Sequence, residues 1–87
     1  SVAGLKRGLI GREVRLLRRR LGMSQEEFSK AYGIPASSVR QYEIGRHMPP
    51  PAVRAYLKAI SAEPEAVLRA LTGKEAKAFD IPDVQAA

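Results

Sequence analysis

The chain has 87 residues, a formal net charge of +6 and no cysteine. This length supports one domain with a small core, and the lack of cysteine excludes a disulfide framework and a thiolate metal site. A single histidine, His47, gives little support to catalysis or metal binding, so we expect no enzyme activity, no metal and no cofactor. No apolar run reaches the roughly 18 residues of a membrane helix, and no signal-peptide pattern is present. These absences predict a cytoplasmic protein without membrane contact.

Apolar residues at helical spacing predict an all-α fold of five short helices. The expected helices cover residues 10–21, 25–32, 36–44, 52–61 and 64–71. Val14, Leu17 and Leu21 form the inner face of the first helix, whereas Leu16 lies off that face. Pro64 suits the first position of the fifth helix because its missing N–H has no partner there.

The two ends of the chain carry weaker patterns. Residues 1–9 contain two glycines and two basic residues, which predicts a weakly ordered arm. Residues 73–87 form a tail in which residues 74–79 could add one helical turn before residues 80–83 break the pattern. The domain itself is therefore expected over residues 10–72.

Most of the positive charge lies in the first half of the sequence. Residues 1–47 contain ten Lys or Arg against four Glu, whereas residues 48–87 contain five residues of each sign. A basic half beside a neutral half indicates a surface that faces phosphate groups. A soluble protein with a plain basic surface has the same composition, so charge alone does not decide.

Residues 24–44 show the strongest local signals. Ser24 is followed three residues later by Glu27, a capping box that satisfies exposed N–H groups at a helix start. Gly33 stands where the first of two helices must stop, at a position that usually needs a left-handed backbone. A turn of about three residues with a glycine lets two helices cross steeply, as in DNA-binding helix-turn-helix units. The motif therefore predicts DNA recognition.

The segments at residues 16–30 and 41–46 resemble the Cro and phage-repressor family of helix-turn-helix proteins, over about residues 10–72. The resemblance implies a lambda-repressor-like domain in a bacterial, nucleoid-associated transcription regulator. It also implies a repressor that binds a double-stranded DNA operator as a homodimer, with the fifth helix and the tail as the pairing surface.

Two other functions are compatible with parts of the sequence. Residues 45–51, 55–60 and 63–68 are similar to HigA-type antitoxins, which implies an alternative: an antitoxin that blocks a toxin protein and autoregulates its operon. A nuclease would need clustered carboxylates or a histidine, and Asp80 and Asp83 in the tail form a poor candidate pair. The antitoxin is therefore the stronger alternative.

The outward side of the third helix carries side chains suited to base edges: Ala36, Ser37, Arg40 and Gln41. In the major groove each base pair shows its own pattern of donors and acceptors. Gln41 matches adenine, and Arg40 matches guanine or a phosphate. Ser37 can donate or accept, and the Ala36 methyl group could meet a thymine methyl group.

Three further residues are expected on phosphates: Gln25, Ser38 and Arg46. Free N–H groups and the positive end of the helix dipole at Gln25 favour an anion. The resemblance implies the phosphate roles of Gln25 and Arg46, and it pairs Arg18 with Glu43 in a structural salt bridge. The sequence departs from the family at Pro35, where a capping Ser or Thr is common.

Overall fold

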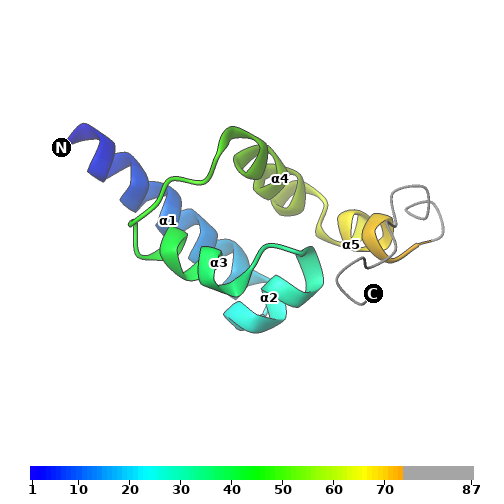
Figure 1. Ribbon diagram of the computed structural model, residues 1–87. Helices are drawn as coiled ribbons and strands as arrows, with labels where there is room; N and C mark the ends of the chain where they lie inside the picture. The colour runs from blue at the N-terminus through cyan, green and yellow to red at the C-terminus, as the bar shows by residue number, and fades with distance from the viewer. Residues whose placement is uncertain (74–87) are drawn as a thin grey trace, which may run out of the picture.

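The computed structural model describes residues 1–73, which fold into five helices without a strand, as predicted (Figure 1). The helices are α1 (Val2–Arg20), α2 (Gln25–Tyr32), α3 (Ala36–Glu43), α4 (Pro51–Ala62) and α5 (Pro64–Thr72). None of these helices is both long and apolar enough to cross a membrane. The helical turn expected at residues 74–79, the rest of the tail, and Asp80 and Asp83 lie outside the described residues.

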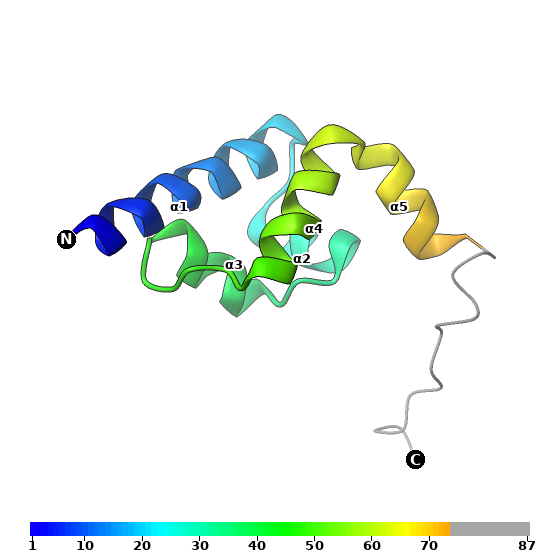
Figure 2. The same ribbon diagram turned by 90° about the horizontal axis from the view of Figure 1, so that it is seen from above.

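Helix α1 is much longer than the sequence predicted. It begins at Val2, where the side chain of Ser1 caps it by accepting a hydrogen bond from the Gly4 N–H at 3.0 Å. The expectation of a weakly ordered segment over residues 1–9 is therefore wrong. In Figure 2 these first turns extend past the loop that joins α3 to α4. A contact far along the chain supports the extension, because Arg7 Nε donates to the Gly45 carbonyl at 3.0 Å.

The local signals around α2 are confirmed. The Ser24 hydroxyl accepts from the Glu27 N–H at 3.0 Å, and the Ser24 N–H donates to the Glu27 carboxylate at 2.8 Å. Gly33 ends α2 with a φ of 79°, in the left-handed region that glycine adopts readily. Pro35 is the N-cap of α3 and makes no side-chain capping bond, yet α3 still begins at Ala36.

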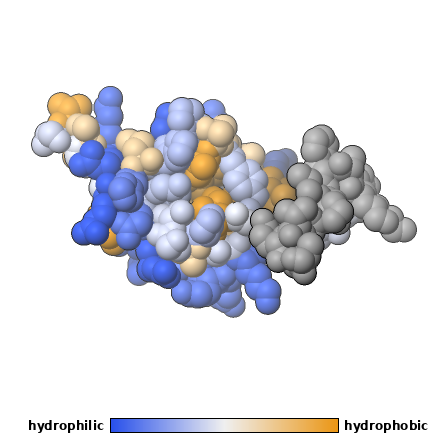
Figure 3. All heavy atoms as spheres, in the orientation of Figure 1, coloured by the Kyte–Doolittle hydropathy of each residue, from blue (hydrophilic) through white to orange (hydrophobic). Residues whose placement is uncertain are grey.

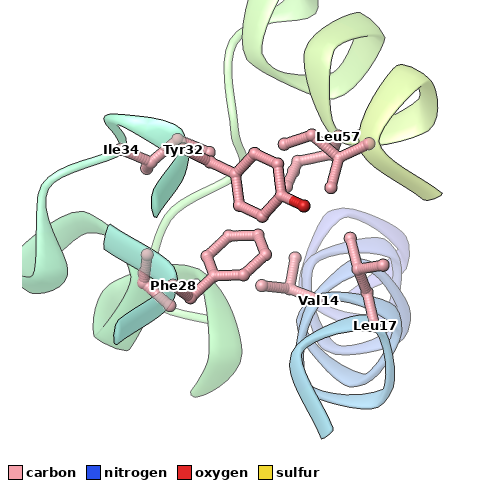
Figure 4. Packing of buried hydrophobic residues seen from close by; sticks show 8 residues of the cluster. Val14, Leu17, Phe28, Tyr32, Ile34 and Leu57 are labelled. Carbon is pink, nitrogen blue, oxygen red and sulfur yellow. The ribbon is translucent and has the colours of Figure 1, made fainter. Parts of the chain in front are cut away.

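Eight buried apolar residues join α1, α2, α3 and α4 (Figure 4). They are Val14, Leu17, Phe28, Tyr32, Ile34, Val39, Leu57 and Ile60. The rings of Phe28 and Tyr32 lie 5.2 Å apart with a tilt of 44°, a favourable aromatic arrangement. Leu16, which the sequence placed off the inner face, is 44% exposed. The core therefore fixes α3 from its inner side only.

Two tyrosine hydroxyls connect the second half of the chain to α2. Tyr32 donates to the Pro64 carbonyl at 3.0 Å, and Tyr56 donates to the Tyr32 carbonyl at 2.6 Å. Each ring fills apolar space while its hydroxyl satisfies a carbonyl at a helix boundary. These bonds hold α4 and α5 against α2 and leave the outer side of α3 uncovered.

Candidate nucleic-acid interface

The backbones of α1 and α3 approach each other at Gly11. A Cβ atom at this buried position would lie 2.3 Å from the Tyr42 carbonyl oxygen and 2.8 Å from that of Glu43. Both distances are far below an ordinary carbon–oxygen contact of roughly 3.3 Å. Glycine is therefore required for α3 to lie this close to α1.

A shared ion pair fixes the end of α3. Arg18 of α1 donates to both carboxylate oxygens of Glu43, at 2.7 and 2.9 Å, and to the Met23 carbonyl at 2.9 Å. Gln25, the first residue of α2, donates from Nε2 to the same carboxylate at 3.2 Å. Glu43 therefore joins α1, α2 and α3 at one point.

This cluster is largely shielded from water, with side-chain exposures of 14% for Arg18 and 5% for Glu43. Burial by itself would raise the pKa of the Glu43 carboxyl, but the hydrogen bonds from Arg18 and Gln25 and the charges of Arg18 and Arg15 lower it below 4.5. The hydrogen bond with Glu43 in turn raises the pKa of Arg18. The ion pair remains charged at neutral pH.

The outer side of α3 presents the residues expected at base edges. Ser37 and Arg40 are exposed, and Ala36 and Gln41 are half-buried. Arg40 forms a solvent-exposed ion pair with Glu26 of α2 at 3.3 Å. Such surface pairs contribute little to stability, so the guanidinium can exchange this partner for another anion at small cost.

The residues expected at phosphates occupy different environments. Arg46 is exposed and follows Gly45, and its backbone N–H donates to the Gln41 carbonyl at 3.0 Å. Ser38 is half-buried on α3. Gln25 lies at the start of α2, as expected, but its amide nitrogen is engaged by Glu43. Its side chain therefore also has a positioning role that the sequence did not reveal.

A hollow of about 310 Å³ lies between α3 and the loop that follows it. Ser37, Ser38 and Gln41 form one side, and His47, Met48 and Pro50 form the other. The structure thus brings three expected contact residues together with His47, Met48 and Pro50, to which the sequence assigned no role. We name this space the α3–loop hollow.

Arg7 and Gly11 are the residues that sequence reasoning missed. Both join α1 to the end of α3, through the Gly45 carbonyl and through close backbone packing. The available signal was the spacing of Gly4, Gly8 and Gly11, which places three glycines at helical intervals. Glycine weakens a helix interior, so its repeated use there indicates that another backbone comes close.

Polar side chains gather on one face of the molecule. Figure 3 shows hydrophilic residues over the lower part of the molecule, where α2 lies in Figure 1, and apolar residues at the projecting end of α1. Arg12, Arg15 and Arg19 are exposed along α1. Positive charge near a polar helix face favours an anionic partner.

Two helices joined by a short glycine-containing turn, the second with a polar outer side, define a helix-turn-helix unit. A family model described as a helix-turn-helix domain matches residues 9–71, which include both helices of the unit. The chain therefore belongs to this DNA-binding family, whose domains are typically not enzymes. No curated protein and no solved structure gives a significant match.

Proposed function

We propose that the protein is a sequence-specific transcription regulator, a repressor, that inserts α3 into the major groove of operator DNA. The observation that carries this proposal is the asymmetry of α3. Its inner side is fixed by the core, by Gly11 and by Glu43, whereas its outer side is polar and open. An α-helix with its side chains is about 10–12 Å in diameter, which suits a major groove about 12 Å wide.

In this proposal Ala36, Ser37, Arg40 and Gln41 face base edges. Arg40 leaves Glu26 when it meets DNA, because a solvent-exposed ion pair is weak.

Contacts to the DNA backbone set the register of the protein on the duplex. We assign these contacts to Gln25, Ser38 and Arg46. Gln25 keeps one amide hydrogen on Glu43 and offers the second to a phosphate oxygen, since an amide nitrogen carries two. The Arg18–Glu43 ion pair holds α3 against the scaffold and makes no DNA contact.

We further propose that two copies act together as a homodimer in the bacterial cytoplasm. One domain of this size covers little DNA, and two half-sites about one helical turn apart supply both affinity and specificity. Helix α5 supports this assignment because it has no fully buried residue and Leu71 is 47% exposed. Sedimentation or light scattering on the full chain should give twice the monomer mass. The Leu71→Asp variant should give the mass of a single monomer.

Fluorescence anisotropy with the DNA upstream of the gene tests the function, with a scrambled duplex beside it at low and near-physiological salt. We expect tighter binding to the upstream duplex. Gln41→Ala should lose roughly 1 to 3 kcal/mol on the preferred site and little on the scrambled one. Arg46→Ala should weaken both duplexes alike and reduce the salt slope by about one. Equal, salt-sensitive binding to every duplex tested would contradict a specific regulator.

A second candidate is an antitoxin that also regulates its own operon. The observation in its favour is an apolar stripe on α1, formed by Val2, Leu5 and Leu9, which are 71, 64 and 54% exposed. Exposed apolar residues grouped at helical spacing are typical of protein-binding surfaces. Co-expression with the product of the neighbouring reading frame tests it: Leu5→Glu should abolish co-purification and leave DNA binding intact. Retained co-purification would exclude this stripe as the binding surface.

A further inference from the structure

The side-chain amide of Gln41 has its oxygen turned toward the protein interior. Its oxygen, Oε1, is buried and has no hydrogen-bond partner within residues 1–73, while the residue as a whole is only half-buried. The amide nitrogen is therefore the polar atom that Gln41 presents outward. Turning the amide over would bury two N–H donors in place of one acceptor, which costs more when none is satisfied.

A donor alone does not match every base. Glutamine pairs with adenine through two bonds, because it must both donate to N7 and accept from the N6 amino group. With Oε1 buried, Gln41 lacks the acceptor for that amino group. Guanine, with N7 and O6, and thymine, with O4, present acceptors at the corresponding edge. The buried oxygen thus disfavours adenine, and guanine and thymine remain as possible partners of the Gln41 amide nitrogen.

The α3–loop hollow distinguishes these two bases. Gln41 lines it, and its lining includes the apolar side chains of Met48 and Pro50 and the ring of Tyr42. Thymine is the one base with a methyl group in the major groove, next to its O4 acceptor. A methyl group that enters an apolar hollow leaves water favourably, whereas guanine has no methyl group to place there.

We propose that Gln41 and the α3–loop hollow together read a thymine: Nε2 of Gln41 donates to O4, and the C5 methyl group enters the hollow beside Met48. This inference rests on the proposed function and specifies the base that α3 selects. It differs from the expectation drawn from the sequence, which paired Gln41 with adenine. It also gives the loop after α3 a part in recognition.

Selection from a random duplex library tests the inference, with wild type and Gln41→Ala carried through in parallel. The base pair whose preference disappears in the variant is the one that Gln41 reads, and we expect thymine there. Loss of one hydrogen bond of ~1 kcal/mol corresponds to about fivefold weaker binding at that site. Circular dichroism of the variant shows whether its helices are intact.

Deoxyuridine then removes the methyl group alone, with the unaltered protein. Replacing the selected thymine should weaken binding about fourfold, the equivalent of ~0.8 kcal/mol for one buried carbon. The same replacement outside the selected site is the control and should change nothing. Met48→Ala should shrink the fourfold penalty, because a wall of the hollow is lost.

The outcomes separate the two proposals. A library with no enriched sequence would overturn the proposed function and this inference with it. An enriched sequence with a G·C pair at the Gln41 position would overturn the inference alone, whereas an A·T pair contains thymine on one strand and is resolved by the deoxyuridine replacement. Thymine at that position without a deoxyuridine penalty would overturn the role of the hollow.

Discussion

Substitution of Gly11 by alanine is the sharpest test of how α3 is positioned. In a helix interior this change would ordinarily stabilise by about 1 kcal/mol, because alanine loses less backbone freedom. Here the new methyl group would lie 2.3 Å from one carbonyl oxygen of α3. To restore an ordinary contact of roughly 3.3 Å, α1 and α3 must separate by about 1 Å.

The size of the destabilisation depends on which atoms the new methyl group contacts. Overpacking typically costs 1–3 kcal/mol, and we expect about 3 because the obstacles are backbone carbonyls that cannot rotate away. After the intrinsic gain of about 1 kcal/mol, Gly11→Ala should destabilise the protein by about 2 kcal/mol. The separation would also stretch the bonds from Arg18 to Glu43 and from Arg7 to Gly45.

Gly8→Ala is the matched control, because a Cβ atom there would meet nothing within 4 Å. It carries the same propensity gain without the clash, so it should stabilise by up to about 1 kcal/mol. Urea and thermal unfolding followed by circular dichroism would measure both variants. About 1 kcal/mol shifts Tm by roughly 4–8 °C in a domain of this size. Equal stability of the two variants would refute the close approach of α1 and α3.

Three further results are expected. Arg18→Met should destabilise by about 3 kcal/mol, because Glu43 keeps its burial and loses its charged partner; a loss below 0.5 kcal/mol in urea unfolding would contradict a buried pair. The unfolding free energy should fall as the pH drops below 4.5, because the folded Glu43 pKa is lowered and the unfolded chain binds the proton more readily. Glu43→Gln should make the unfolding free energy, measured by urea titrations at several pH values, less dependent on pH. Part of the pH dependence should remain in this variant, because the pKa of Glu27 is also lowered. Ser24→Ala should cost about 1 kcal/mol through the lost cap of α2, and an unchanged midpoint would show that the cap is dispensable.

Local signals gave most of the fold. The capping box at Ser24 and the positive φ at Gly33 set both ends of α2 within a few residues of sequence, so the sequence was sufficient to place them. The start of α1 was missed because Gly4 and Gly8 weaken the helix locally, and the Ser1 cap is supplemented by a contact with the distant Gly45 carbonyl. Propensity describes neighbours along the chain, whereas that contact joins residues 38 positions apart.

In the candidate site, too, some features follow from the local sequence and others depend on distant contacts. The side of α3 that faces outward follows from helical periodicity, and the exposure of Ser37 and Arg40 agrees with it. The engagement of Gln25 by Glu43 and the buried oxygen of Gln41 depend on side-chain conformation and on the following loop. Neither has a spacing rule in the sequence, so both required the structure.

The shortness of α3 ties its existence to the whole fold. Isolated helices shorter than about 12–15 residues are marginal in water, and α3 has eight. Its helical form therefore comes from the packing of Val39 and from the contacts with α1 and α2. The proposed base-reading surface and the folded core should melt in a single cooperative step. Heating should end DNA recognition at the temperature at which the domain unfolds, and no partly unfolded form of the chain should retain sequence preference.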